Sequence, residues 1–192
     1  MIRELLYTPN LLTLLRLIFI PLTVIAVLEN HYIWALVLFL VAGISDGLDG
    51  LLARLLQQKT VLGQYLDPIA DKLLLSTMFL VLSIAHRVPW SVTVLVFSRD
   101  IIIVIISALL YATGQFRAVR PSWWGKANTL AQIVTIPLVL LREISSAHWI
   151  VWGRWLGIRV TVALTIFSGV HYAMRVAFEL RAAGAKAADT SK

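Results

Sequence analysis

The segment that decides the fold is YIWALVLFLVAGISDGLDGLLARLL, residues 32–56. Its apolar part, residues 32–44, is shorter than the roughly 20 residues that a transmembrane helix needs. The segment can cross a membrane only if the helix continues to about Leu56. This continuation places three ionisable residues at one end of the span: Asp46, Asp49 and Arg54. Ionisable residues within a span are candidates for a functional site.

The composition of the whole chain is that of a membrane protein. Of 192 residues, 59% are hydrophobic and 14% are charged, and the mean hydropathy is +0.85. Soluble domains have about 45–50% apolar and about 25% charged residues. Spans of about 20 residues joined by short loops would use almost the whole length, which leaves no room for a separate soluble domain. The chain has no cysteine, so any metal must be bound by oxygen or imidazole.

Six apolar stretches are predicted to span the membrane, and a short interfacial helix over residues 2–8, ended by Pro9, is predicted to precede them. The predicted spans run from about Leu11 to Leu28, Tyr32 to Leu56, Gln64 to Ala85, Trp90 to Ala112, Trp123 to Leu141 and Trp155 to Leu180. We expect a turn at residues 60–63 and a disordered tail at residues 182–192. The predicted fold class is therefore an all-α integral membrane protein, with one membrane domain over residues 1–181.

Six spans place both termini on one side of the membrane, and basic residues indicate which side. The face shared by the termini carries Arg3, Arg54, Lys59, Arg117, Arg120, Lys126, Arg175, Arg181, Lys186 and Lys192, against Arg87, Arg142, Arg154 and Arg159 on the other. The termini and the acidic span ends are thus expected on the cytoplasmic or matrix side of a bacterial or mitochondrial inner membrane. The net charge of +7 forms no basic domain, so anionic lipids are the expected partners and nucleic acid is not.

Four aspartates lie at helical spacing on the second and third predicted spans. Asp46 and Asp49 share one helical face, and so do Asp67 and Asp71. The short connection at residues 57–63 makes the two helices antiparallel neighbours, so the four carboxylates are expected to converge. Clustered carboxylates near a bilayer are costly unless cations neutralise them. Oxygen ligands favour Mg²⁺, Mn²⁺ or Ca²⁺ over zinc, and two such ions would clamp a transferring phosphoryl group.

Small and basic residues accompany the aspartates. Gly50 and Ala53 lie on the face of Asp46 and would let a ligand approach the backbone closely. Arg54, one residue beyond that face, can make a bidentate contact with a phosphate. Two other interpretations stay open at this point. The acidic residues can be ordinary interfacial residues, or they can belong to a cation channel or transporter, which would place them near the middle of the membrane.

Two motifs lie eight residues apart in the chain: Asp46-Gly-Leu-Asp49-Gly50-Leu-Leu-Ala53-Arg54 and Gly63-Gln-Tyr-Leu-Asp67-Pro-Ile-Ala-Asp71. Together they resemble the complete signature of the CDP-alcohol phosphatidyltransferase family. The six predicted spans and the start Pro9-Asn10…Arg16 extend the resemblance over nearly the whole chain. It implies an enzyme of phospholipid biosynthesis that moves a phosphatidyl group from CDP-diacylglycerol to an alcohol and releases CMP.

The resemblance also implies roles for individual residues. Two divalent ions, Mg²⁺ or Mn²⁺, would be bound by Asp46, Asp49, Asp67 and Asp71. Asp71 would also be the general base that takes the proton of the acceptor hydroxyl. The residues implied to hold the CDP moiety are Gly50, Ala53, Arg54, Gly63, Asn10 and Arg16. A homodimer is a further expectation from the resemblance.

The identity of the acceptor alcohol rests on finer similarities. The run Leu66-Asp67-Pro68-Ile-Ala-Asp71-Lys72 resembles the branch that makes phosphatidylglycerol phosphate or cardiolipin. Enzymes that use glycerol 3-phosphate usually carry Arg-Glu and a second arginine eight residues later, whereas this chain has Arg99-Asp100 and Ser107. The run from Arg120 to Gln132 also resembles cardiolipin synthases. We therefore favour phosphatidylglycerol as the acceptor, with glycerol 3-phosphate as the alternative.

Two basic residues are predicted to bind the phosphate of either acceptor, namely Arg99 and Lys126. Each also has a structural interpretation. Lys126 can be an interfacial lysine whose amine reaches for water, and Arg99 can form a structural ion pair with Asp100.

Overall fold

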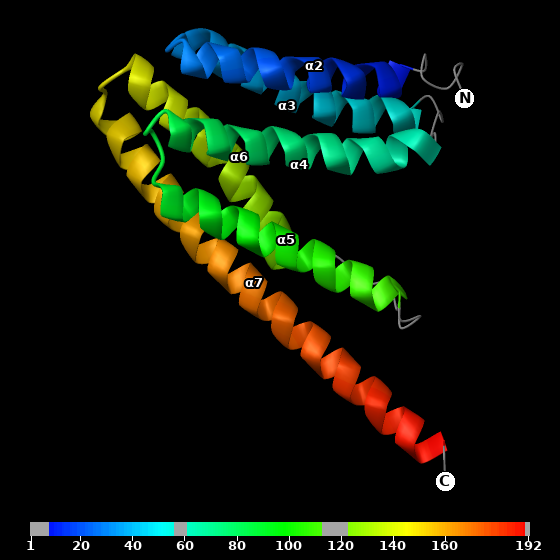
Figure 1. The fold of residues 1–192 in the computed structure, drawn as a ribbon. Coiled ribbons are helices and arrows are strands. Elements are labelled where there is room, and N and C mark those ends of the chain that lie inside the picture. The colour runs from blue at the N-terminus through cyan, green and yellow to red at the C-terminus, as the bar shows by residue number, and fades with distance from the viewer. Residues whose placement is uncertain (1–7, 56–60, 113–122, 191–192) are drawn as a thin grey trace.

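The computed structural model describes the backbone of residues 8–55, 61–112 and 123–190, and side chains within residues 14–45, 70–106 and 123–178. The described residues are almost entirely helical (Figure 1). The helices are α2 (Thr8–Leu28), α3 (Tyr32–Leu55), α4 (Val61–Ile84), α5 (Trp90–Ala112), α6 (Trp123–Ile144) and α7 (His148–Thr190).

Most helix bounds confirm the sequence prediction. α5 begins and ends at the predicted residues, and α3 ends one residue before the predicted Leu56. The polar end of the second predicted span is therefore helical, as the length argument required. α2 begins at Thr8, earlier than predicted, with Pro9 in its first turn. Proline suits this position because its missing N–H has no helical partner there in any case. The predicted interfacial helix over residues 2–8 lies almost wholly outside the described residues.

Two predicted boundaries differ from the structure. α4 already begins at Val61, so Gly63 lies in its first turn and not in the expected connection; a single glycine costs a helix only about 1 kcal/mol. α7 begins at His148, seven residues before the predicted start, and its helical backbone continues to Thr190. The sequence predicts disorder from residue 182 onward, but the alanines and lysines there also favour helix.

The helices form two groups joined by α6. α2 packs against both α3 and α4, α6 packs along α7, and α5 also lies against α7. Figure 1 shows α2, α3 and α4 running alongside one another, while α5 and α7 run obliquely away from them. α6 contacts α3 and α4 as well as α7. The buried apolar core lies where these elements meet, and its fully buried members include Val27, Ala35, Phe79, Leu82, Ile136, Val139 and Leu140.

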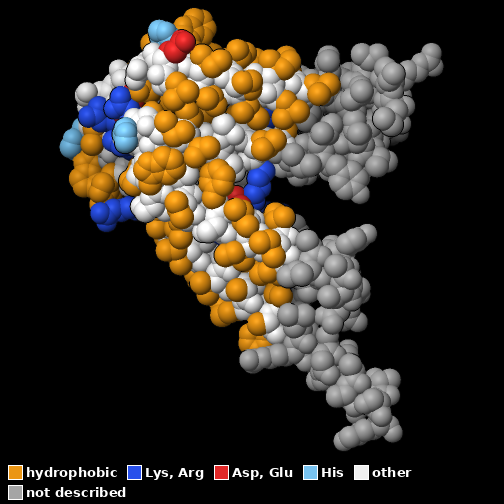
Figure 2. Space-filling view, in the orientation of Figure 1, with side chains coloured by type: hydrophobic (Ala, Val, Ile, Leu, Met, Phe, Trp, Pro, Cys, Tyr) orange, Lys and Arg blue, Asp and Glu red, His pale blue; other side chains and the backbone are white. Residues whose placement is uncertain are grey.

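The outer surface of the helices is strongly apolar (Figure 2). Two helical segments among the described residues, Trp123–Ile144 and His148–Phe178, are long and apolar enough to span a membrane. α2 and α3 contribute shorter apolar stretches, Leu14–Leu28 and Tyr32–Ser45. Many large apolar side chains on every helix are exposed, which is unfavourable in water and suited to lipid. The other four predicted membrane spans remain predictions.

One end of the molecule is closed by side-chain contacts around Arg87. The guanidinium of Arg87 lies 2.9 Å from Glu143 and donates to the hydroxyl of Tyr32 at 3.1 Å. Arg154 donates to the backbone oxygen of Arg87 at 2.7 Å. These contacts tie α3, α6 and α7 to the connection between α4 and α5. Figure 2 shows a hollow on the other side of the molecule, with basic and acidic side chains at its inner end.

Candidate functional site

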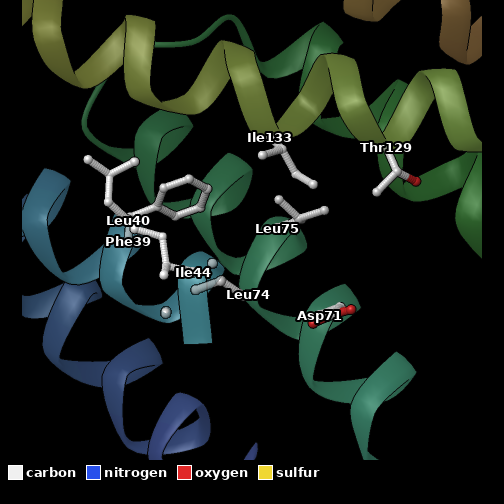
Figure 3. A pocket seen from close by; sticks show the side chains of 10 residues that line it. Phe39, Leu40, Ile44, Asp71, Leu74, Leu75, Thr129 and Ile133 are labelled. Atoms are coloured by element: carbon white, nitrogen blue, oxygen red, sulfur yellow. The ribbon is translucent and has the colours of Figure 1, made fainter. Parts of the chain in front are cut away.

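Two cavities meet at Asp71. The first, of about 300 Å³, lies between α3, α4 and α6 and is mostly apolar (Figure 3). The second, of about 230 Å³, is lined by Asp71, Lys72, Leu75, Arg99, Asp100, Thr129 and Gln132. Asp71, Leu75 and Thr129 line both cavities. The carboxylate that the family resemblance implies as the general base therefore lies between an apolar space and a polar one.

The carboxylate of Asp71 is ion-paired with Arg16. Arg16 projects from α2, has no exposed side-chain area, and donates from Nη1 to Oδ1 of Asp71, whose own side chain is 42% exposed. A buried cation is costly without a partner, and the packing of α2 on α4 brings this partner to it. The pair orients the carboxylate while leaving it open to both cavities.

A second group of charges in the polar cavity joins α4, α5 and α7. The Nζ of Lys72 and the Nη1 of Arg99 each lie 2.9 Å from the same oxygen of Asp100. Arg99 also donates from Nε to the hydroxyl of Ser168 at 3.2 Å. Gly169 of α7 lies beside the stem of Arg99; a Cβ there would be in ordinary contact with its Cγ, at 3.6 Å. Two cations are thus held on one wall of the cavity that contains Asp71.

A row of buried polar side chains, here called the polar seam, lies between α6 and α7 next to the polar cavity. Buried Asn128 accepts a hydrogen bond of 2.8 Å from Thr165, and its Nδ2 has no partner among the described residues. The hydroxyls of Thr135 and Thr161 lie 2.9 Å apart. This seam was not among the features predicted from the sequence. A signal was present, since Asn128, Gln132 and Thr135 are buried polar residues on one face of an apolar helix.

The structure brings together only some of the predicted site residues. Asp71 and Arg99 line the polar cavity, and Arg16 is ion-paired with Asp71. Lys126 does not line either cavity; its side chain is exposed and its Nζ lies 5.6 Å from the ring centre of Trp123. The structure adds two residues that the prediction did not include, Lys72 and Asp100.

The remaining predicted residues have helical backbones, but their side chains lie outside the described ones. α3 carries Asp46, Asp49, Gly50, Ala53 and Arg54, α4 carries Gly63 and Asp67, and α2 carries Asn10. Because both helices are continuous through these positions, the predicted spacing of three and four residues within each pair of aspartates holds.

The donor set at these positions is compatible with divalent metal ions. The four predicted ligands offer only carboxylate oxygens, which hard cations such as Mg²⁺ and Mn²⁺ prefer. Asp71, the one ligand with a described side chain, faces open space at the junction of the cavities. Among the described side chains no three His, Asp or Glu residues form a metal-binding group, and three of the four predicted ligands are not among them.

Comparison with known proteins assigns the chain to a family. Residues 6–167 match the model of the CDP-alcohol phosphatidyltransferase family. A protein of Mycobacterium tuberculosis H37Rv named probable phosphatidylglycerophosphate synthase is 34% identical over 172 residues, which cover 86% of this chain and 79% of that protein.

Two further relatives carry the name CDP-diacylglycerol–glycerol-3-phosphate 3-phosphatidyltransferase. The protein of Salmonella choleraesuis is 36% identical over 174 residues, covering 85% of this chain and 91% of the relative. The protein of Haemophilus influenzae is 33% identical over 170 residues, covering 85% and 90%. The expected enzyme class is thus confirmed over most of the chain, and the channel interpretation is not. The chain belongs to the CDP-alcohol phosphatidyltransferase family and is a transferase of phospholipid biosynthesis.

Proposed function

We propose that this enzyme transfers the phosphatidyl group of CDP-diacylglycerol to glycerol 3-phosphate, with release of CMP. The observation that carries the choice of acceptor is the pair of cations, Lys72 and Arg99, in the polar cavity beside Asp71. The sequence favours phosphatidylglycerol because Ser107 stands where a second arginine is usual. Lys72 supplies a second cation from a different helix, and the names of the relatives also favour glycerol 3-phosphate over phosphatidylglycerol.

The size and polarity of the cavity support a small phosphorylated acceptor. Six of its seven described lining residues are charged or polar, and its volume is about 230 Å³. Glycerol 3-phosphate is compact and carries a terminal phosphate with three unsubstituted oxygens, which two cations can contact at once. Phosphatidylglycerol presents a phosphodiester and two acyl chains, which this polar space does not match.

The proposed reaction is a displacement at the β-phosphorus of the donor. The acceptor hydroxyl oxygen forms the new P–O bond, the pyrophosphate P–O bond breaks, CMP leaves, and Asp71 takes the hydroxyl proton. Arg16 holds the Asp71 carboxylate in place through their ion pair. Arg99 and Lys72 position the acceptor phosphate so that its hydroxyl reaches Asp71. Positioning of this kind and electrostatic stabilisation dominate catalysis of phosphoryl transfer.

The family uses divalent metal ions, and we propose Asp46, Asp49, Asp67 and Asp71 as the ligands of two Mg²⁺ or Mn²⁺ ions. Bound ions would offset the negative charge of the phosphates as it shifts during transfer. Gly50, Ala53, Arg54, Gly63 and Asn10 are proposed to hold the CDP moiety. For Arg16 the contact with Asp71 favours a role in orienting that carboxylate.

The proposed setting is the bacterial inner membrane, with six spans in one domain over residues 1–181 and a possible homodimer. The matched relatives are bacterial. The start of α2 and the end of α7 lie on the same side, away from the connections between α2 and α3 and between α4 and α5 (Figure 1). Together with the distribution of basic residues, this arrangement supports termini and an active site facing the cytoplasm.

The test is CMP release by purified protein with CDP-diacylglycerol and Mg²⁺, with either glycerol 3-phosphate or phosphatidylglycerol as acceptor. Release with glycerol 3-phosphate alone supports the proposal. Release with phosphatidylglycerol alone would establish the cardiolipin synthase activity favoured by the sequence and would remove the proposed role of the polar cavity. A control without acceptor measures donor hydrolysis.

A further inference from the structure

One polar side chain in the polar cavity makes no hydrogen bond within the described protein. Of the six charged or polar residues that line this cavity, four take part in the ion pairs described above, namely Asp71, Lys72, Arg99 and Asp100. The fifth, Thr129, donates its hydroxyl to the backbone oxygen of Gly125 at 3.2 Å. The sixth is Gln132 of α6, whose amide has no hydrogen-bond partner among the described residues.

The position of Gln132 makes this unused amide costly. The side chain is only 4% exposed and borders the polar cavity. Its amide carries two donors and an acceptor, and burying such a group without partners is unfavourable. A methionine of about the same length would avoid this cost on an otherwise apolar helix. Asn128, the other buried amide of α6, is bonded to Thr165 and does not line the cavity. The amide of Gln132 is therefore the one placed to contact a ligand.

We propose that Gln132 binds the secondary hydroxyl of the glycerol acceptor and makes the enzyme select acceptors that carry it. The inference rests on the proposed function in taking a glycerol-type acceptor. Glycerol 3-phosphate has a phosphate at one end, a primary hydroxyl at the other and a secondary hydroxyl between them. The cations Lys72 and Arg99 match the phosphate, and Asp71 matches the reacting primary hydroxyl.

Gln132 supplies the contact that remains. It projects from α6, whereas Asp71 belongs to α4 and Arg99 to α5, so the three groups of the acceptor meet three different helices. A neutral amide suits a hydroxyl, because it can donate to the hydroxyl oxygen and accept the hydroxyl proton. A site built to hydrogen-bond a hydroxyl rejects analogues that lack it, because its own buried group is then left unpaired.

The experiment compares two acceptors in the wild-type enzyme and in Gln132→Met. The acceptors are glycerol 3-phosphate and 3-hydroxypropyl phosphate, which keeps the phosphate and a primary hydroxyl but lacks the secondary one. The measurement is kcat/KM for CMP release with CDP-diacylglycerol and Mg²⁺. We expect the wild-type enzyme to prefer glycerol 3-phosphate by about 5- to 150-fold, the effect of leaving a buried hydrogen-bonding group unpaired. In Gln132→Met the preference should fall to within about twofold.

The matched control is Thr135→Val. Thr135 is buried on α6 three residues from Gln132, bonds to Thr161 at 2.9 Å, and does not line the polar cavity. It should keep the wild-type preference, because a purely structural defect lowers kcat/KM for both acceptors by the same factor. Gln132→Asn keeps the polarity of α6 but withdraws the amide by one methylene group, and it should also lower the preference. A wild-type enzyme without the preference, or a preference unchanged in both Gln132 variants, overturns the inference.

The acceptor assignment is tested separately from the role of Gln132. If the wild-type enzyme releases CMP with phosphatidylglycerol and not with glycerol 3-phosphate, the proposed function fails. The same comparison then uses phosphatidylglycerol and phosphatidylpropane-1,3-diol, which lacks the secondary hydroxyl of the head group. A preference for phosphatidylglycerol that is lost in Gln132→Met supports the role of Gln132 with that acceptor, and an unchanged preference overturns it.

Discussion

Replacing Arg99 with glutamine tests whether the polar cavity binds the acceptor phosphate. Arg99 lines this cavity, is only 13% exposed, and lies 2.9 Å from Asp100. Glutamine retains a hydrogen-bond donor but removes the positive charge and the second donor of the fork. A hydrogen bond to a charged group contributes about 1.5–3 kcal/mol, which corresponds to about 10- to 150-fold in affinity. We therefore expect the KM for glycerol 3-phosphate to rise about 10- to 100-fold, with a smaller change in kcat because Asp71 is untouched.

Lys126→Gln is the matched control, because the sequence predicts the same role for Lys126. Its amine lies over the ring of Trp123 and away from both cavities, so we expect the KM to change less than about twofold. Ser168→Ala removes only the 3.2 Å hydrogen bond to Arg99 and should raise the KM by about 2- to 10-fold. The assay is the initial rate of CMP release against glycerol 3-phosphate concentration at saturating donor. An unchanged KM in Arg99→Gln, or an equal rise in Lys126→Gln, would refute the assignment of the polar cavity.

Three further predictions concern the base, the metal and the packing of α6 on α7. Asp71→Asn should lower the rate of CMP release by about 10²- to 10⁴-fold in protein that elutes as wild type; undiminished release would exclude Asp71 as the base. Removal of divalent ions with EDTA should abolish CMP release and added Mg²⁺ or Mn²⁺ should restore it, whereas persistent activity would contradict a metal-dependent reaction. Gly157→Ala should destabilise the fold by about 1–3 kcal/mol, because its Cβ would lie 2.9 Å from Thr135, and should lower the Tm in detergent by roughly 2–12 °C. Gly43→Ala, with no described atom nearby, should leave the Tm unchanged or raise it, and equal effects of the two substitutions would show that the close α6–α7 contact is not what Gly157 provides.

Local sequence pattern was sufficient to predict most of the helices. The apolar runs and the breaks between them gave α5 at both ends and α3 to within one residue. The start of α7 could not be predicted in this way, because Gly153 and Arg154 interrupt its apolar pattern. They are accommodated by tertiary contacts: Gly153 lies close to Leu138 of α6, and Arg154 donates to the backbone oxygen of Arg87. Contacts between residues so distant in the chain leave no local signal.

For the site too, the sequence motifs predicted some of the residues, whereas others depend on how the helices pack. The signature identified Asp71, and its resemblance to a family added Arg16, which the structure places in contact with that carboxylate. The contact of Lys72 with Asp100 depends on how α4 and α5 are rotated about their own axes. The sequence does not fix this rotation, so Lys72 was not among the residues predicted to bind the acceptor phosphate. Lys126 was included for its charge, although its position on α6 keeps it away from the cavities.

On the proposed function, the charges around Asp71 indicate where the acceptor phosphate and the donor diphosphate bind relative to this carboxylate. The described charges beside it comprise three cations, Arg16, Lys72 and Arg99, and two carboxylates, Asp71 and Asp100, which gives a net charge of +1. These described charges favour the binding of an anion on this side of Asp71. On the proposed function, the three other signature aspartates would repel a diphosphate unless divalent ions are bound, so we expect the donor to bind on the side of the metal ions. On the proposed function the acceptor phosphate and the donor diphosphate therefore bind on different sides of Asp71, and the acceptor hydroxyl meets the β-phosphorus beside the carboxylate that takes its proton.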